Sequence, residues 1–227
     1  PEKHSETAFM TNRAIDFIKE TKEQWFLHLS YIKPHWPYIA PAPYHNMYSQ
    51  NQFYPVQRSN AEKEINHPVY KAFRENSISK TFSQENVRET VLAGYMGLIK
   101  QIDDNLGRLF KFLEENGNME DTMIVFTSDH GDYHGDHWLG EKELFHEQIV
   151  KVPMIIYDPT ENANNTRGKK EKRFIEAIDL LPTFLDAVGS KASKHRLEGL
   201  SLIPILRGEK VNNWRESVFS EIDYSFN

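Results

Sequence analysis

The stretch DTMIVFTSDHGDYHGDHWLGEK, residues 121–142, sets the expectations for the fold. Residues 123–127 are apolar or β-branched, which is typical of a short strand buried on both faces. Asp129 and His130 follow almost at once, so a carboxylate and an imidazole stand side by side where a buried strand ends. Lys142 closes the stretch. We therefore expect ligand-binding chemistry at this strand end.

Helical patterns alternate with short apolar strands around this stretch. Residues 86–116 keep apolar side chains three or four positions apart, and residues 5–22 and 179–188 show shorter helical patterns. Residues 25–31, WFLHLSY, and residues 152–157, VPMIIY, are predicted strands. This alternation predicts an α/β fold with a mostly parallel sheet covered on both faces by helices. Ligands bind beyond the carboxyl ends of the strands in such sheets.

Two segments between these elements have no predicted regular structure. Prolines interrupt IKPHWPYIAPAPYH, residues 32–45, which carries His35 just beyond the first predicted strand. Residues 50–83 are polar, and we expect an irregular excursion over the surface. The apolar stripe of the long helix is expected to pack on the sheet; its members are Val87, Val91, Tyr95, Leu98, Ile102, Leu106, Leu109 and Leu113.

Composition narrows the function classes. The 227 residues suffice for one sizeable domain with a real core, and 39% of them are hydrophobic against 26% charged, so we expect a soluble globular protein. The net charge of -6 argues against a nucleic-acid partner, which requires a basic face. A bilayer-spanning helix needs about 18 consecutive apolar residues, and no run approaches that length. The chain has no cysteine, which excludes disulfides and a thiol nucleophile within it. A cytoplasmic and a periplasmic or secreted location both stay open.

The residue types at the strand end suit a metal. A carboxylate such as Asp129 beside a neutral imidazole such as His130 suits Mn²⁺ or Zn²⁺, and carboxylates alone also suit Ca²⁺ or Mg²⁺. Two ligands do not complete a site, so others must come from elsewhere. The competing interpretation is that Asp129 caps a turn and His130 is an ordinary loop residue. Taken alone, Lys142 and His35 are equally compatible with a solvated lysine and a structural histidine. The same holds for Asp132, His134, Asp136 and His137.

In this order, the segments resemble the sulfatase family of the alkaline phosphatase superfamily. The resemblance rests on FLHLSYIKPHWPY, GYMGLIKQIDDNLGRLFKFLEENG, the opening stretch, VKVPMIIYDP and AIDLLPTFLDAVG. The closing EGLSLIPILRGEKVNNWRESVFSEIDYSF looks most like the phosphonate monoester hydrolase and arylsulfatase branch. The resemblance implies an alkaline-phosphatase-like α/β sandwich. It also implies hydrolysis of sulfate esters or of phosphonate or phosphate mono- or diesters.

The resemblance assigns roles to four residues. Asp129 and His130 would hold one divalent metal ion, with Mn²⁺ or Ca²⁺ favoured over Mg²⁺ or Zn²⁺. His35 and Lys142 would contact a small anionic ester substrate, because fixed cations stabilise charge on the transferring group. The family's nucleophile is a formylglycine made from a Cys/Ser-x-Pro-x-Arg motif, and this sequence has no such motif. The family's early Asp-Asp metal pair is also missing.

This departure implies that the 227 residues are the C-terminal part of a longer enzyme, with residues 198–227 as a family-type tail. The nucleophile and remaining ligands would come from an upstream part of the same enzyme, and the chain alone would be inactive. We expect no nucleic-acid or membrane partner, and homo-oligomers are compatible with such a tail. Two alternatives stay open: a non-catalytic metal-binding or interaction module, and a phosphodiesterase with a Thr or Ser nucleophile. The ester, the metal, the oligomeric state and the compartment also stay open.

Overall fold

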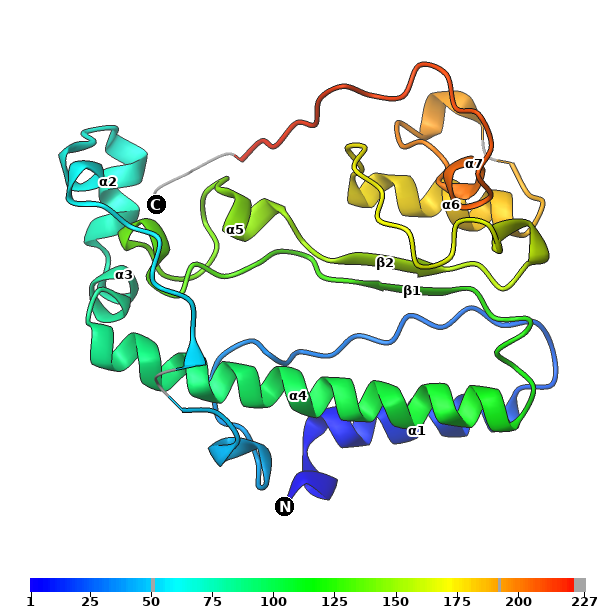
Figure 1. Ribbon diagram of the computed structural model, residues 1–227, viewed down its shortest axis with the longest axis horizontal. Helices are drawn as coiled ribbons and strands as arrows, with labels where there is room; N and C mark the ends of the chain where they lie inside the picture. The colour runs from blue at the N-terminus through cyan, green and yellow to red at the C-terminus, as the bar shows by residue number, and fades with distance from the viewer. Residues whose placement is uncertain (50–51, 192, 223–227) are drawn as a thin grey trace. The chain divides into compact units, whose positions relative to one another are not determined.

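The computed structural model describes residues 1–49, 52–191 and 193–222 and divides into two compact units (Figure 1). The first unit consists of Pro1–Asn118 and His130–Lys151, and the second of Met119–Asp129 and Val152–Asn227. The chain therefore passes from the second unit to the first between Asp129 and His130. Within the described residues, no helix has the length and apolar character needed to span a membrane.

Two helices lie side by side in the first unit, α1 (Glu6–Glu20) and α4 (Glu85–Glu115) (Figure 1). Both confirm the predicted helices. The Ser5 side chain caps α1 by accepting a backbone N–H, because the first N–H groups of a helix have no partner within it. Gly117 follows the end of α4 with φ 71°, a conformation that glycine adopts without strain.

The face of α4 that packs on α1 is partly polar. The Gln101 amide donates to Ser5 Oγ over 2.6 Å, and the Asn105 amide donates to Glu2 Oε1 over 3.1 Å. These hydrogen bonds turn the polar side chains inward, so the predicted apolar stripe is only partly buried and Leu106 is half-exposed. The fully buried members of the stripe are Leu98, Leu109 and Leu113.

The prediction of an irregular stretch at residues 50–83 is wrong. Two helices form there, α2 (Pro68–Glu75) and α3 (Ser77–Phe82), preceded by the 3₁₀ helix η4 (Asn60–Glu64). Proline at the first position suits the start of α2, and Asn76 caps α3 by accepting the Ser79 N–H over 2.7 Å. These local signals outweigh the polar composition. Residues 50 and 51 lie outside the described residues.

Short helices and two small apolar clusters complete the first unit. One cluster joins Tyr70, Tyr133, Leu139 and Ile149, and the other joins Ala40, Tyr44 and Leu98. The short helices are η1 (Glu2–His4), η2 (Tyr44–Asn46), η5 (Asp136–Trp138) and α5 (Glu147–Val150). The first cluster lies around the loop that carries Lys142, so this loop has a core of its own.

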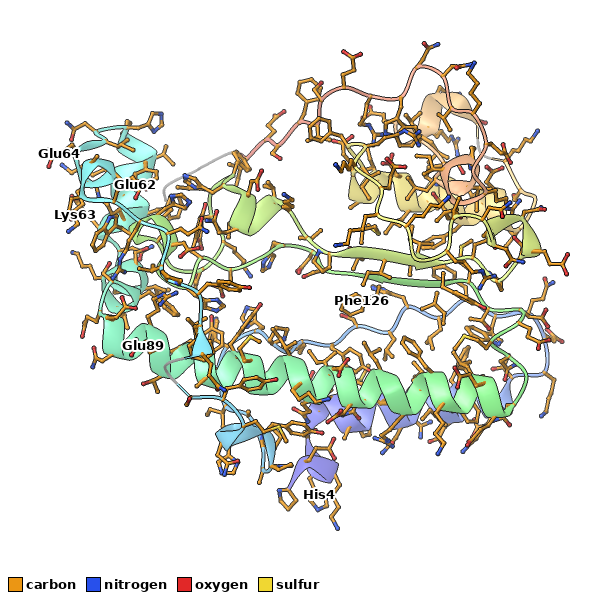
Figure 2. All side chains as sticks on the ribbon, viewed as in Figure 1. His4, Glu62, Lys63, Glu64, Glu89 and Phe126 are labelled. Carbon is orange, nitrogen blue, oxygen red and sulfur yellow. The ribbon has the colours of Figure 1, made fainter. Side chains whose placement is uncertain are left out.

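The second unit contains two strands, β1 (Ile124–Thr127) and β2 (Met154–Tyr157), which confirm the predictions at residues 123–127 and 152–157. They pair in antiparallel fashion, with Phe126, which projects from β1 in Figure 2, opposite Ile155. The helix α6 (Leu180–Ala187) confirms the prediction at residues 179–188. The remaining helices are η6 (Glu161–Ala163), η7 (Ala177–Asp179), η8 (Lys194–Arg196) and α7 (Ile203–Leu206).

The predicted strand at residues 25–31 does not form. Side-chain exposure alternates along it with a period of two, as in a strand, but the segment joins no ladder among the described residues. The expected parallel sheet depended on this strand pairing beside residues 123–127. The strand pair that forms in the described part of the chain is antiparallel, so the parallel pairing is not found there.

A buried ion pair anchors the C-terminal tail, residues 198–222, to α6. Asp179 is fully buried, and its carboxylate accepts hydrogen bonds from both terminal nitrogens of the Arg215 guanidinium. The backbone N–H groups of Glu176 and Leu200 donate to the same carboxylate over 2.8 and 2.7 Å. Burial alone would raise the pKa of Asp179, but these hydrogen bonds outweigh it and hold the pKa below its usual value. The carboxylate is therefore charged at neutral pH.

Candidate functional site

Asp129 lies directly beyond the end of β1, where the sequence predicts it, separated from Thr127 by Ser128. The Ser128 hydroxyl donates a hydrogen bond to Asp129 Oδ1 over 3.3 Å, and the Asp129 side chain is exposed. An exposed carboxylate at a strand end presents hard oxygen ligands of the kind that divalent cations prefer. The position of Asp129 therefore suits a metal ligand.

The His130 ring is held in one tautomer. Its Nδ1 lies 2.8 Å from the carbonyl oxygen of Gly131. Because a carbonyl oxygen can only accept, Nδ1 carries the proton in the neutral ring and Nε2 carries the lone pair. A backbone carbonyl plays this part for many metal-binding histidines. In the neutral tautomer, Nε2 is the ring nitrogen with metal-ligand chemistry.

Gly131 fixes the backbone that follows His130. A Cβ atom at this position would lie 1.8 Å from the carbonyl oxygen of Gln148 in α5. The Gly131 N–H donates to the carbonyl oxygen of Ile149 over 2.9 Å, which holds the two segments in this close approach. Any larger residue at position 131 would therefore push His130 away from its place.

The Lys142 segment, residues 132–146, folds back on itself. The Tyr133 N–H donates to the Glu141 carbonyl oxygen over 2.9 Å, and positive φ angles at Gly135 (95°) and Glu141 (60°) turn the chain. The Lys142 side chain is half-buried. None of the ion pairs among the described residues involves its ammonium group. A compact cation outside these ion pairs is suited to an anionic group from outside.

Acidic groups flank Lys142 in the sequence. The Lys142 backbone N–H donates to a carboxylate oxygen of Glu143 over 3.0 Å. Burial, followed by the nearby Glu143 carboxylate, raises the pKa of Glu141. The Lys142 ammonium therefore belongs to a locally acidic loop.

His35 is exposed in a turn of the proline-rich loop. Its Nδ1 lies 2.9 Å from the carbonyl oxygen of Trp36, so the neutral ring carries its lone pair on Nε2, as in His130. The Lys33 ammonium donates to the carbonyl oxygens of His35 and Pro37 over 3.0 Å each and closes the turn. These bonds hold the imidazole in a defined orientation at the surface of the first unit.

Tyr38 connects the His35 loop to the chain that follows His130. Its hydroxyl donates to Asp132 Oδ2 over 2.8 Å, a bond between residues 94 positions apart. Burial, followed by the Asp132 carboxylate, raises the pKa of Tyr38, so the hydroxyl keeps its proton and remains a donor. No pattern in the sequence singles out Tyr38, because its partner is remote in the chain.

The Asp132 carboxylate also supports a buried histidine. His134 Nε2 lies 3.3 Å from Asp132 Oδ2. The rings of Tyr95, Tyr38 and Phe82 surround the imidazole, with centroids at 4.3, 5.5 and 5.8 Å. Burial lowers the pKa of His134, which favours the neutral ring. Asp132 and His134 thus act in the packing of the loop, and the sequence alone left this role open.

Three of the four predicted residues are carried by segments that are bonded to one another. The Tyr38–Asp132 hydrogen bond joins the loop of His35 to the chain after His130, and the Tyr133–Glu141 hydrogen bond joins that chain to the residue before Lys142. All these segments belong to the first unit. Asp129 belongs to the second unit and precedes His130 in the chain. His35 and Lys142 make no hydrogen bond with each other in the described structure.

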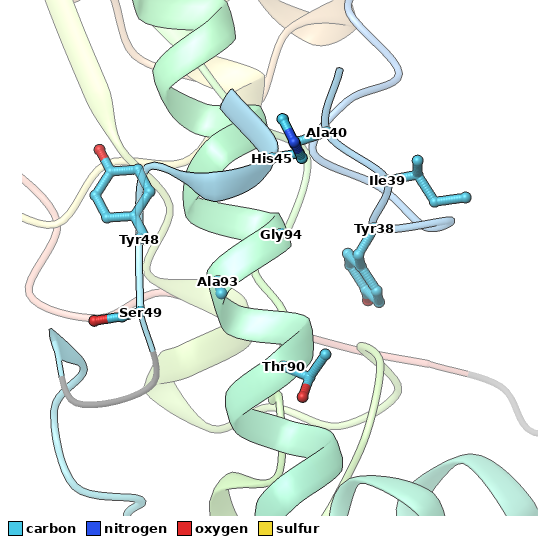
Figure 3. Close-up of a pocket in the computed structure, with 9 residues that line it drawn as sticks. All are labelled: Tyr38, Ile39, Ala40, His45, Tyr48, Ser49, Thr90, Ala93 and Gly94. Atoms are coloured by element: carbon cyan, nitrogen blue, oxygen red, sulfur yellow. The ribbon is translucent and has the colours of Figure 1, made fainter. Parts of the chain in front are cut away.

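A shallow pocket of about 610 Å³ lies between the His35 loop and the first turns of α4 (Figure 3). Its lining contains no Asp, Glu, Lys or Arg side chain, so it suits an uncharged group. Tyr38 belongs to its wall, which connects the pocket to the Tyr38–Asp132 hydrogen bond. The lining residues are Tyr38, Ile39, Ala40, His45, Tyr48, Ser49, Thr90, Ala93 and Gly94.

The described residues do not form a complete metal site. They contain no group of three or more His, Asp or Glu side chains placed to hold an ion. Asp129 and His130 offer one carboxylate and one imidazole, whose tautomer is the one a metal needs. Divalent cations take at least four ligands in proteins. The donor set therefore fits a metal, provided that further ligands come from elsewhere.

Comparison with known proteins places these features in a family. The sequence model of the sulfatase family matches residues 2–190. A multifunctional alkaline phosphatase superfamily protein of Trinickia caryophylli is 36% identical over 99% of this chain and 46% of its own length. An arylsulfatase of Clostridium perfringens is 32% identical over 95% of this chain and 44% of its own length. The chain thus spans somewhat less than half the length of these curated relatives.

Solved structures agree on the fold. A phosphonate monoester hydrolase of Agrobacterium radiobacter superposes with a TM-score of 0.87 at 30% identity, covering 95% of this chain and 45% of that one. A phosphonate monoester hydrolase from Silicibacter pomeroyi gives a TM-score of 0.81 at 32% identity, covering 95% of this chain and 44% of that one. These similarities confirm the expected alkaline-phosphatase-like α/β class, although the described residues contain only a small part of a sheet.

Proposed function

The chain belongs to the sulfatase family, and on that premise we propose that it forms the C-terminal part of a metal-dependent hydrolase of sulfate or phosphonate esters. Asp129 and His130 bind one divalent metal ion, with Mn²⁺ or Ca²⁺ preferred, and His35 and Lys142 bind the anionic part of the ester. Relatives named arylsulfatase and phosphonate monoester hydrolase support this reaction class.

One structural observation supports this assignment most directly. The Tyr38–Asp132 and Tyr133–Glu141 hydrogen bonds hold together the segments that carry His35, His130 and Lys142. These bonds connect the His35 loop and the Lys142 segment through residues 132 and 133 of the first unit. A substrate clamp requires this connection, because its cations must stay in place while charge develops on the transferring group.

The residues of this chain act on the substrate as binding and orienting groups. Lys142 offers a compact point charge to the ester oxygens, and His35 approaches from the proline-rich loop. A bound divalent cation would neutralise the ester and lower the pKa of the attacking hydroxyl. The nucleophile, a formylglycine, comes from outside these 227 residues, which contain neither Cys nor a Ser-x-Pro-x-Arg motif. The isolated chain is therefore inactive.

The test removes the carboxylate that ends β1. In the complete enzyme, Asp129→Ala is expected to lower metal content and the hydrolysis of an aryl sulfate and a phosphonate monoester together, because it deletes a ligand. Asp121→Ala, an exposed acid at the other end of the same strand region, serves as the control and is expected to change neither. Metal stoichiometry that is unchanged in Asp129→Ala would overturn the assignment.

A further inference from the structure

Two histidine rings stack at the base of the Lys142 segment. His137 in η5 and His146 before α5 lie with ring centroids 4.1 Å apart and planes inclined by 17°. His137 precedes Lys142 and His146 follows it, so the stack closes the loop that presents the lysine. The proposed function gives this pair no role.

The ring of His137 is held between two oxygen atoms. Its Nδ1 lies 2.8 Å from Glu62 Oε1, and its Nε2 lies 3.3 Å from Gln148 Oε1. The Gln148 amide nitrogen donates to Asp136 Oδ2 over 3.3 Å, which orients its oxygen toward His137. Both ring nitrogens therefore face side-chain oxygens, and Glu62, labelled in Figure 2, connects the ring to η4.

The partners of His146 keep it neutral. Its Nδ1 lies 2.7 Å from the Tyr133 hydroxyl, and that hydroxyl also accepts the His146 backbone N–H over 3.5 Å. The Tyr133 hydroxyl thus contacts both the ring and the backbone of His146. Tyr133 is buried, with 2% of its surface exposed. Burial, followed by the nearby charge of His137, lowers the pKa of His146.

The stack also fixes the loop to elements outside it. Glu62 belongs to η4, and the Tyr70 hydroxyl of α2 donates to the His137 carbonyl oxygen over 2.8 Å. The Tyr70 ring lies against His146 with centroids 6.0 Å apart. The other charged and titratable groups around the stack are Asp136 of η5, Arg74 of α2, which lies over the Tyr70 ring, and Tyr133. Burial alone would raise the pKa of Glu62, but its hydrogen bonds with the Ser59 N–H and with His137 outweigh it and hold the pKa below its usual value.

We infer that the His137–His146 stack, bonded to Glu62 and Tyr133, positions the Lys142 segment and releases it when His146 takes up a proton. A proton on His146 would place a positive charge against the His137 ring, whose centroid lies 4.1 Å away, at a position where burial and His137 disfavour it. The part of the inference that concerns Lys142 rests on the proposed function. The part that concerns closure of the loop by the stack is independent of it.

The experiment separates these two parts. In the complete enzyme, hydrogen-exchange protection of the Tyr133 and Gly135 amides, corrected for intrinsic rates, is followed between pH 7.5 and about pH 5. These amides donate within the loop to Glu141 and Leu139. Protection is expected to fall at least tenfold on acidification. A protection that does not change with pH in the unaltered protein would overturn the inference, with no variant needed.

His146→Phe provides the matched test, because it keeps a flat ring for stacking and cannot take up a proton. Protection in this variant is expected to become independent of pH, and the acidic limb of the turnover profile is expected to shift to lower pH. His67→Phe, at an exposed histidine of the same unit, is expected to behave like the unaltered protein. Acid loss of protection that persists in His146→Phe would overturn the role of His146. If protection depends on pH and turnover does not, the stack is upheld as the closure of the loop, and the role of Lys142 in the proposed function fails.

Discussion

The Lys142 segment of the first unit and the tail of the second are both irregular stretches held by charged side chains, but the charges differ in kind. The tail depends on Asp179 and Arg215, a buried carboxylate and a guanidinium whose charges are fixed at every physiological pH. The Lys142 segment depends on the stacked rings of His137 and His146, and burial lowers the pKa of His146. One anchor is permanent and the other is conditional. The conditional anchor lies beside the proposed cation of the substrate site.

The largest expected effect comes from breaking the permanent anchor. Asp179→Ala leaves the Arg215 guanidinium and two backbone N–H groups without their acceptor, and removing one partner of a buried ion pair costs about 3–5 kcal/mol. Urea unfolding of the purified protein measures this loss. Asp186→Ala is the control. Asp186 is an exposed residue of α6, and its carboxylate accepts a hydrogen bond from the Ser201 hydroxyl. Equal losses in the two variants would show that the buried pair does not anchor the tail.

The next largest effect is expected at Lys142, the residue that the conditional anchor holds. Lys142→Ala in the complete enzyme is expected to reduce turnover about a hundredfold, the scale of losing one preorganised donor to a developing anion, with metal content unchanged. Lys151→Ala removes an exposed lysine paired with Glu147 and is expected to leave turnover near normal. Steady-state kinetics on sulfate and phosphonate esters compares the two. Near-normal turnover in Lys142→Ala would make the lysine a solvated loop residue.

A smaller effect is expected at the Tyr38–Asp132 hydrogen bond, which joins the His35 loop to the chain that follows His130. Tyr38→Phe deletes the hydroxyl that donates to Asp132 over 2.8 Å, and a hydrogen bond to a charged group contributes about 1.5–3 kcal/mol. Denaturant unfolding measures the loss, and substrate KM is expected to rise because His35 is less well oriented. Tyr54→Phe is the control, since Tyr54 is 90% exposed. Indistinguishable unfolding curves for the two variants would deny this connection.

The smallest expected effect is the order in which falling pH weakens the two anchors. The pKa of folded His146 lies below the ordinary value of about 6.5, so the unfolded chain binds the proton first and the stabilising contribution declines as pH falls through that value. The pKa of folded Asp179 lies below the ordinary value of about 3.9, so its contribution is complete above that pH and is lost below it. Amide exchange is expected to rise first in the Lys142 segment and only later at Leu200. Simultaneous loss, or the reverse order, would contradict the comparison.

Sequence patterns predicted the elements whose causes are local. The helices α1, α4 and α6 follow from apolar spacing together with residues such as Ser5 and Gly117 at their ends. The strand expected at residues 25–31 has the correct period of two, but a ladder also requires a partner strand, which a local pattern does not contain. The helices α2 and α3 were missed because polar composition concealed their proline and asparagine signals.

The candidate site shows the same division. The pattern of residues 121–142 identified Asp129 and His130 as candidates, and the resemblance to a family gave them and Lys142 and His35 their roles, which remain predictions. The groups that hold these residues in place escaped sequence reasoning. Tyr38 and Glu62 act on partners 94 and 75 positions away, and contacts at such separations leave no periodic trace.

The Tyr38–Asp132 hydrogen bond also has a consequence for the order of events during synthesis. A ribosome adds roughly 5–20 residues per second, so the 94 positions between the two residues take roughly 5–19 s to appear. Helices form in microseconds or less. The long helix α4 is therefore complete well before Asp132 exists, and the His35 loop waits beside it without its acceptor. Contacts between residues so far apart in sequence also form more slowly during folding than local contacts do. The bonded arrangement of the His35 loop is thus among the last parts of the first unit to form, and the nascent chain exposes this loop for seconds.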